Sequence, residues 1–318
     1  MAAHASSLPV MYSVVVAVYN SVVTLPELAL RIDKVLKLDL GQTYELIFVN
    51  DGSINPETMP ALEKLQVEYP EVKVVQLARN FGQHAATLCG IRYAQGQFII
   101  TIDDDLQHLP EELPQLLALQ QYDVVFANFE EPQQPFLQRI GSKLKAWLDC
   151  RLFQKPTAVQ FSSFRLISRP VADYLATCQV PYPYLPALIL QATNSVAAVK
   201  VAHAPRPAGK SGYTLGKQLG IIGNMLINHS TVPLKSISLC GILIAGFSFM
   251  AMLFILLRKF FVQVNTTGWT SLIVTLLFIG GLLLLAVGII GEYLSRTLAG
   301  VEKRPMYVVR KTAGFNHD

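Results

Sequence analysis

Three consecutive carboxylates, Asp103, Asp104 and Asp105, stand near the middle of the chain, closely followed by Gln107. They come directly after the apolar residues 98–100, which predicts that they stand at the end of a buried strand. Side chains alternate along a strand, so Asp103 and Asp105 would share one face and Asp104 would point to the other. Adjacent carboxylates repel unless a cation neutralises them, and hard oxygen ligands suit Mg²⁺ or Mn²⁺ holding a diphosphate. The alternative is a solvated acidic turn or a helix N-cap.

The elements that would position these residues alternate along the first part of the chain. Strands are predicted at 11–18, 44–49, 72–77 and 97–102, and helices at 25–38, 57–68 and 83–94. Such alternation predicts an α/β fold, with a mostly parallel sheet and helices on both faces. Ligands of such sheets bind beyond the carboxyl ends of the strands.

Two other polar clusters are expected at that same edge of the sheet. Tyr19 and Asn20 follow the first predicted strand, and Asn-Asp-Gly-Ser at 50–53 follows the second. Asn, Asp and Gly serve turns well, so each cluster alone is readily explained as a turn. Three clusters on one edge favour a ligand site, in which Asp51 accepts hydrogen bonds from a base or ribose and Asp103 with Asp105 holds a diphosphate through a metal.

Two long uncharged stretches occupy residues 236–257 and 269–291. Each exceeds the roughly 20 residues that cross a bilayer, which predicts two transmembrane helices joined as a hairpin. The N-terminus lacks the basic start and long apolar core of a secretory signal, and basic residues flank the hairpin at both ends. We therefore expect a cytoplasmic domain over 1–230 and a cytoplasmic basic tail over 292–318.

Charge is divided unevenly along the chain. Residues 200–318 hold 12 Lys/Arg against 3 Asp/Glu, whereas residues 1–199 hold 14 against 19. The basic part favours the membrane and a phosphate-bearing lipid as partners, and no nucleic-acid partner is expected. Residues 136–153 and 214–230 combine helical apolar spacing with basic residues, which indicates helices lying in the membrane interface. Ordinary amphipathic helices packed on the domain are the alternative.

Other phosphate-binding chemistries do not fit the sequence. No Gly-x-Gly-x-x-Gly follows the first predicted strand, and Gly209-Lys210-Ser211 lacks the upstream glycine of a P-loop because position 204 is Ala. The 4 cysteines show no paired metal spacing, which indicates reduced thiols.

Several motifs carry a resemblance that covers nearly the whole chain. In order they are VVVAVYN, LIFVNDGS, LARNFGQHAAT, ITIDDDLQHLPEE, FRLISR, HAPRPAGKSGYTLGK, GEYLSR and RPMYVV. The chain resembles family 2 glycosyltransferases of the polyprenyl-phosphate type. Bactoprenyl-phosphate glucosyltransferases and undecaprenyl-phosphate aminoarabinosyltransferases share these N-terminal motifs and a C-terminal pair of transmembrane helices. Dolichyl-phosphate mannose synthases are similar in the N-terminal domain.

The resemblance implies a GT-A fold and an inverting transfer from a nucleotide-sugar, with UDP favoured, to a polyprenyl phosphate such as undecaprenyl phosphate. Transfer would take place at the cytoplasmic face of a bacterial inner membrane, for cell-envelope glycan synthesis. By position, the implied donor-binding residues are Tyr19, Asn20, Asp51, Arg79, Asn80 and Asp103. The implied ligands of Mg²⁺ or Mn²⁺ are Asp105, also counted as catalytic, and Gln107. The implied acceptor-phosphate residues are Arg165, Arg206, Lys210 and Tyr213.

The chain departs from the pattern of these relatives at several positions. Ala17 and Ser21 stand where the relatives usually carry Pro and an acid, and Asp104 stands where they often carry a small residue. Gln160 occupies the place of an Asp that is proposed as a base or acceptor-site group. Gln cannot accept a proton at neutral pH, so either no base is needed or another acid, such as Asp104 or Glu130, replaces it.

Two other functions remain as alternatives. A processive polysaccharide synthase shares the head but usually carries a Gln-x-x-Arg-Trp motif, and the chain contains no Arg-Trp pair. A membrane-anchored binding or scaffold protein with a degenerate head would explain Gln160 but not the intact acidic motif. The small residues Gly280, Gly281 and Gly288 permit close helix contact, so a homo-oligomer through the hairpin is also expected.

Overall fold

The computed structural model describes residues 9–129, 156, 159–180, 183–202, 204, 268–301 and 305–315, with isolated residues between 239 and 254. The chain divides into two compact units. One consists of Met1–Gly212 with Arg304–Asp318, and the other of Tyr213–Lys303. Both ends of the chain therefore belong to the first unit, which we call the head.

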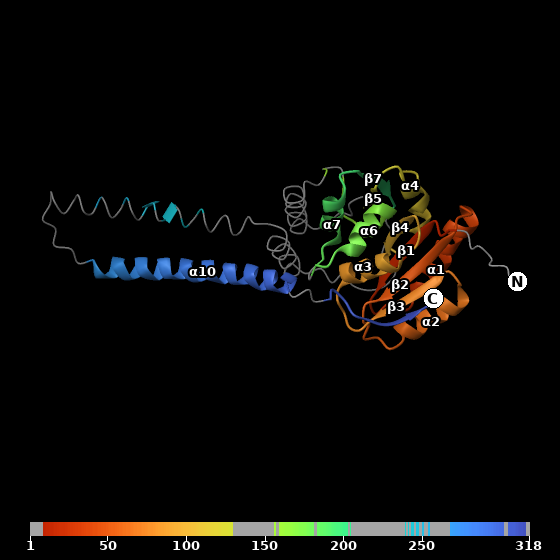
Figure 1. The fold of residues 1–318 in the computed structure, drawn as a ribbon, viewed down its shortest axis with the longest axis horizontal. Helices are drawn as coiled ribbons and strands as arrows, with labels where there is room; N and C mark the ends of the chain where they lie inside the picture. Colours follow the sequence, from red (N-terminus) through yellow and green to blue (C-terminus); the bar gives the residue numbers. More distant parts are fainter. Residues whose placement is uncertain are drawn as a thin grey trace. The chain divides into compact units, whose positions relative to one another are not determined.

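The head is built on an eight-stranded sheet with the order β7-β5-β6-β4-β1-β2-β3-β8 (Figure 1). Strands β1 to β4 are mutually parallel, as the alternation of elements predicted, and β5 is parallel to β7. Strand β6 runs antiparallel to β4 and β5, and β8 runs antiparallel to β3. The strands are β1 (Tyr12–Val18), β2 (Tyr44–Asn50), β3 (Val72–Leu77), β4 (Phe98–Asp103), β5 (Val124–Phe129), β6 (Arg165–Ser168), β7 (Val196–Val201) and β8 (Val309–Ala313).

Helices cover both faces of the sheet, and each face has its own apolar core (Figure 1). One face packs against α1 (Leu25–Asp33), a π-helical continuation (Lys34–Asp39), α2 (Thr58–Glu68), a 3-10 turn (Pro110–Glu112) and α4 (Leu113–Leu117). The other packs against α3 (Gln83–Tyr93), α6 (Arg169–Thr177) and α7 (Leu185–Ala192). Prolines in the first turns of α1, α6 and α7 suit helix starts, because the amide that proline lacks has no helical partner there.

Strand β1 shows how the sequence sets these two cores. Val14, Val16 and Val18 contact the α1 side, and Val15 contacts the α3 side, as alternation in a strand requires. All four are buried, which explains why this strand is apolar on both faces.

The register of the central strands brings their carboxyl ends together. Ala17 lies opposite Asp103, and Val18 lies opposite Asn50. The clusters that follow β1, β2 and β4 therefore share one edge, as predicted.

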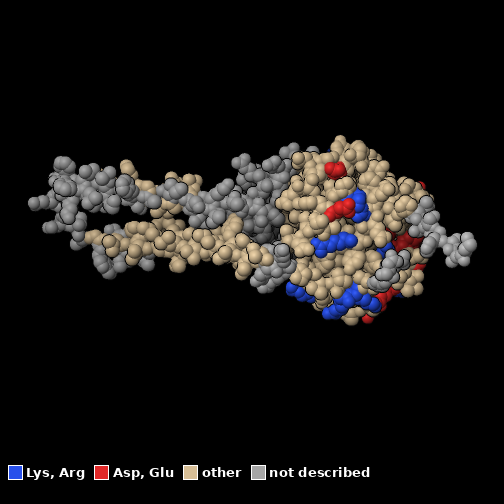
Figure 2. All heavy atoms as spheres, viewed as in Figure 1, with Lys and Arg blue, Asp and Glu red and all other residues tan. Residues whose placement is uncertain are grey.

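The second unit contains α10 (Trp269–Val301), which is 33 residues long. Within it Phe278–Ser295 has a mean hydropathy of 1.9, and none of that stretch is buried. In the described part of the chain, α10 is the single helix that is long and apolar enough to cross a membrane. Figure 2 shows charged side chains on the head and none on the described atoms of α10 on this face.

The C-terminal part differs from the expected tail over 292–318. The helix α10 continues to Val301, and Val309–Ala313 forms the edge strand β8 of the head. The sequence did not predict this strand because it contains charged residues. An edge strand with one solvated face needs few apolar residues. The interfacial helices expected at 136–153 and 214–230 lie outside the described residues, and only isolated helical residues are described within the span expected at 236–257.

Candidate active site

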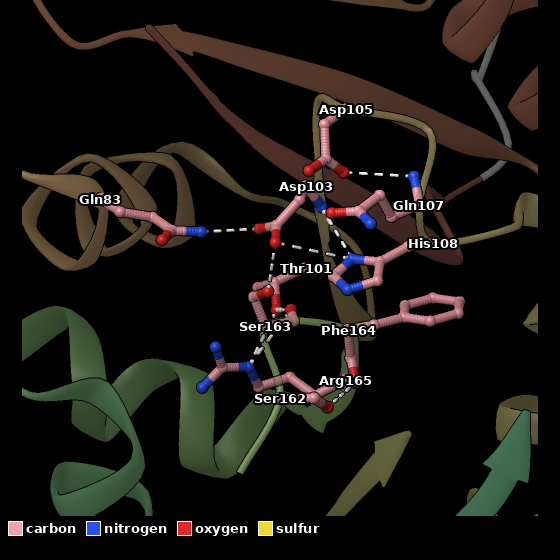
Figure 3. Close-up of polar contacts among 10 residues, drawn as sticks. All are labelled: Gln83, Thr101, Asp103, Asp105, Gln107, His108, Ser162, Ser163, Phe164 and Arg165. Carbon is pink, nitrogen blue, oxygen red and sulfur yellow. Dashed lines mark hydrogen bonds and ion pairs between the residues drawn. The ribbon is translucent and has the colours of Figure 1, made fainter. Parts of the chain in front are cut away.

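Asp103, the last residue of β4, is held by groups from three parts of the head (Figure 3). Its Oδ1 accepts a hydrogen bond from Gln83 Nε2 (2.6 Å), and its Oδ2 accepts one from Ser163 Oγ (2.6 Å). Its backbone amide donates to His108 Nδ1 (3.3 Å). Both carboxylate oxygens are therefore already partnered, which fixes the direction of Asp103 and makes it a support for the site.

Asp105 and Gln107 lie on the loop that follows Asp103, with their side chains directed toward each other (Figure 3). Asp105 Oδ1 accepts a hydrogen bond from the backbone amide of Gln107 (3.1 Å), and both residues are half-buried. Among the described residues there is no cluster of three or more His, Cys, Asp or Glu that could hold a metal by itself. One carboxylate and one amide oxygen nevertheless fit Mg²⁺, which takes few protein ligands and completes its shell with phosphate and water oxygens.

Asp104 interacts with groups at the end of β1. Its carboxylate receives a hydrogen bond from the Ser21 hydroxyl and another from the Tyr19 amide. Burial raises the pKa of Asp104 to about 6, against the lowering effect of the Ser21 hydrogen bond. Two departures from the relatives' pattern, at 21 and 104, are thus in direct contact.

Asp51, a predicted donor-binding residue, is bonded to the loop that precedes α3. Its Oδ1 accepts from the Phe81 amide (2.7 Å) and its Oδ2 from the Gly82 amide (2.9 Å), and the side chain is buried. Burial raises the pKa of Asp51, and these two backbone hydrogen bonds oppose the rise. These two hydrogen bonds hold the loop that precedes α3, and each carboxylate oxygen can still accept a further hydrogen bond.

Asn20 likewise holds a neighbouring loop. Its backbone has a φ of 62°, a left-handed conformation that Asn tolerates better than most residues. Its Oδ1 accepts from the amides of Ile54 (2.9 Å) and Asn55 (3.0 Å), and its own amide donates to Ser53 Oγ (2.9 Å). The ends of β1 and β2 are therefore joined through Asn20.

Three predicted donor-binding residues are exposed at the same edge. Tyr19 is 45% exposed, and Arg79 and Asn80 are exposed on the loop after β3. The Arg79 guanidinium lies over the Phe81 ring, 4.6 Å from its centre. These side chains are exposed and therefore available to a ligand.

Arg165 is not placed as a phosphate-binding residue. It is 2% exposed, and its Nε donates to Thr101 Oγ1 (3.0 Å) beneath Ser163 and Asp103 (Figure 3). Burial lowers the pKa of Arg165 to about 10, so the guanidinium stays charged at neutral pH. The negative charge of Asp103 opposes this lowering. The sequence could not show this, because the burial of Arg165 depends on β4 and β5 on either side of β6.

Gln160 is exposed, and its backbone amide donates to Asn128 Oδ1 (2.8 Å) at the end of β5. The position expected for a base is thus at the site edge, close in sequence to Ser163. Arg206, Lys210 and Tyr213 lie outside the described residues. The Ala204 amide, two positions before Arg206, donates to the Gln107 carbonyl (3.1 Å), so the chain reaches the expected metal ligands there.

Sequence reasoning missed Gln83, Ser163 and His108 as parts of the site. His108 is buried, and its ring stacks on Phe129 (4.9 Å between centres) and Phe164 (5.5 Å). Its Nδ1 accepts a hydrogen bond from the Asp103 amide (3.3 Å) and lies 3.8 Å from Asp103 Oδ2. The motif LARNFGQHAAT contains Gln83, but no spacing rule links it to Asp103.

Comparison with known proteins places this site in a family. A family model described as Glycosyl transferase family 2 matches residues 13–173, which include all the contacts around Asp103. The chain belongs to this family. The resemblance drawn from the motifs is confirmed at this level.

Relatives of this family 2 member match along nearly its whole length. An uncharacterized glycosyltransferase of Bacillus subtilis, YkcC, is 32% identical over 97% of this chain and 96% of its own. An undecaprenyl-phosphate 4-deoxy-4-formamido-L-arabinose transferase of Aeromonas hydrophila is 32% identical over 94% of this chain and 93% of its own. The crystal structure of a mycobacterial protein covers 69% of this chain and 74% of its own with a TM-score of 0.51 at 16% identity, which concerns the fold alone. The head is thus a GT-A-like α/β fold.

Proposed function

We propose that this family 2 glycosyltransferase transfers a sugar from a UDP-sugar to undecaprenyl phosphate or a similar polyprenyl phosphate. The observation that carries the proposal is the position of Ala204, whose amide donates to the Gln107 carbonyl. It brings the start of the basic motif that contains Arg206 and Lys210 beside the acidic motif. The relatives named for undecaprenyl phosphate match nearly the whole chain, which supports a lipid phosphate as the acceptor.

The residues at the sheet edge suit this chemistry. An oxygen of the acceptor phosphate attacks the anomeric carbon, and the bond to the leaving UDP breaks on the opposite side, with inversion. Tyr19, Arg79 and Asn80 are exposed to bind the donor, and Asp105 with Gln107 would hold Mg²⁺ or Mn²⁺. The metal ion, when bound, neutralises the charge that develops on the leaving diphosphate.

No strong base is required in this scheme. A phosphate acceptor is already ionised at neutral pH, whereas a sugar hydroxyl must lose a proton. The amide of Gln160 cannot take a proton, and here it does not need to. The same residue at the site edge can donate a hydrogen bond to the acceptor phosphate.

The position of β8 supports a membrane hairpin whose two ends lie on the same side of the membrane as the head. The head contains residues on both sides of Tyr213–Lys303, and β8 is hydrogen-bonded to β3. If α10 crosses the membrane, the chain must cross it an even number of times between 212 and 304. The apolar stretch 236–257 supplies the second crossing, and its described residues Leu243 and Phe247 are helical and exposed.

The test is transfer by the purified full-length protein. UDP-sugars, Mn²⁺ and undecaprenyl phosphate in detergent should give a sugar-labelled lipid that mass spectrometry identifies. Asp105→Ala should lower the rate by at least about a hundredfold, because it removes charge stabilisation of the leaving group. The matched control is Asp39→Ala, an exposed acid before β2 begins, at the far edge of the sheet, which should keep full activity.

A scaffold protein would give different results. It would form no labelled lipid with any nucleotide-sugar, and its affinity for UDP would not depend on Mn²⁺. Full activity of Asp105→Ala would instead remove the metal assignment while leaving the transferase.

A further inference from the structure

The chain segment that follows α10, residues 305–310, returns to the head and packs into it. We call it the return segment. Met306 is 8% exposed and belongs to the apolar core on the α3 side of the sheet, and Tyr307 packs against that core. Strand β8 then pairs with β3, with a register shift between Gln76 and Leu77. The return segment is therefore part of the core of the head.

The return segment also holds the loop that carries the exposed Arg79 and Asn80. We call residues 78–82 the donor loop. The Ala78 amide donates to the Val308 carbonyl (2.8 Å), and Arg310 Nη2 donates to the Ala78 carbonyl (3.3 Å). Both backbone polar groups of the first residue of the donor loop are thus bonded to the chain that returns from α10.

Tyr307 connects the return segment to the other end of the donor loop through α3. Arg92 Nη1 donates to the Tyr307 hydroxyl (3.1 Å), and the Arg92 guanidinium lies over the Tyr307 ring at 5.3 Å. The Tyr307 hydroxyl also bonds to the Cys89 thiol, whose pKa burial raises to about 12. Cys89 and Arg92 are one turn apart on α3, so Tyr307 is attached to this helix at two points.

Helix α3 transmits that attachment to the acidic groups of the site. The Gly82 amide, just before α3, donates to Asp51, and Gln83 in its first turn donates to Asp103. The helix is buried along most of its length and has 11 residues, so it moves as one body. A shift at Arg92 would change the distances at Asp51 and Asp103.

We propose that Tyr307 is a positioning residue for donor binding. The return segment holds the donor loop at both ends, at Ala78 by hydrogen bonds with Val308 and the Arg310 side chain and at Gly82 through α3. The polypeptide that leaves the membrane helix thereby shapes the pocket for the nucleotide-sugar. The inference rests on the proposed function and deepens it, because it assigns a role in donor binding to a residue outside the donor loop.

The test compares Tyr307→Phe with the wild-type full-length protein. Loss of the hydroxyl leaves Arg92 and Cys89 without their bonds to the return segment, while the ring keeps its packing. Hydrogen exchange of the Phe81 and Gly82 amides, which are bonded to Asp51, should become about tenfold faster. The KM for the nucleotide-sugar should rise by about threefold to tenfold, with kcat within about twofold of wild type.

The matched control is Lys311→Met in β8. Lys311 pairs with Glu63 on the surface (2.6 Å) and touches neither α3 nor the donor loop through its side chain. Wild-type exchange and KM in this control support the proposal. An equal effect in both variants would show that β8 matters only for stability.

Two other results would overturn the proposal. One is unchanged exchange of the Phe81 and Gly82 amides in Tyr307→Phe, and the other is faster exchange spread evenly over the whole head. The exchange measurement needs no activity, so it decides the role of Tyr307 even if no nucleotide-sugar is accepted. A failure of the transfer reaction in wild-type protein would count against the proposed function alone.

Discussion

At the scale of single residues, the contact between Ser21 and Asp104 explains two departures from the family pattern together. The relatives that the motifs resemble carry an acid at the position of Ser21 and often a small residue at that of Asp104. Here the Ser21 hydroxyl and the Tyr19 amide both donate to Asp104. This chain thus keeps one carboxylate where β1 and β4 end. It follows β4 here, whereas it follows β1 in those relatives.

This exchange predicts a double-mutant cycle. Asp104→Ala should weaken UDP binding by about tenfold, because the Tyr19 amide loses a charged acceptor. Ser21→Glu should also weaken it, because it places a second carboxylate beside Asp104. The double variant Ser21→Glu with Asp104→Ala should regain most of the affinity, measured by calorimetry. Additive losses in the double variant would show that the two sites are independent.

The acidic motif itself could be predicted from the sequence, whereas its supports could not. The apolar run before Asp103 placed it at a strand end, and the alternation of a strand separated Asp104 from Asp105. Gln83 and Ser163 are 20 and 60 positions from Asp103, and only the folded sheet brings them to it. The burial of Asp51 and Arg165 was also missed, because Asp and Arg side chains are seldom buried.

At the scale of elements, the loops after β2 and β3 fit together through one glycine. Gly52 has a φ of 59°, and a Cβ there would lie 2.2 Å from the Arg79 carbonyl carbon. The sequence Asn-Asp-Gly-Ser predicted a turn, but not that the turn packs against the donor loop. The bounds of β1 to β4 followed from apolar runs to within a residue or two, whereas β5 to β8 were not predicted; β6 and β8 are short and contain charged residues.

Gly52→Ala should therefore both destabilise the head and weaken donor binding. The matched control is Gly41→Ala, because Gly41 has a similar φ of 62° and no atom within 4 Å of the added Cβ. The control should lose about 1 kcal/mol of unfolding free energy from the left-handed backbone alone. Gly52→Ala should lose about 1–3 kcal/mol more through the clash with Arg79. Thermal unfolding and UDP binding measure both, and equal losses would contradict the packing role.

At the scale of the whole molecule, the proposed hairpin follows from a constraint that the sequence alone did not contain. Apolar length predicted two crossings, and the basic flanks predicted their direction. The structure adds that residues 1–212 and 304–318 share one folded unit. The described α10 is about 50 Å long, so its apolar part, 269–291, is long enough to span the roughly 30 Å hydrocarbon core.

This arrangement predicts that Gly268, directly before α10, lies on the outer side of the membrane. Cysteine labelling tests it in a variant whose Cys150, Cys178 and Cys240 are replaced by Ala; the remaining Cys89 is buried, and a pKa of about 12 keeps its thiol unreactive. In spheroplasts, Gly268→Cys should react with a membrane-impermeant maleimide, and Leu38→Cys on the head, 71% exposed, should react only after the membrane is opened. Labelling of both positions only in opened membranes would mean that the chain does not cross before α10. Such a result would leave α10 lying on the membrane surface or packed against another protein.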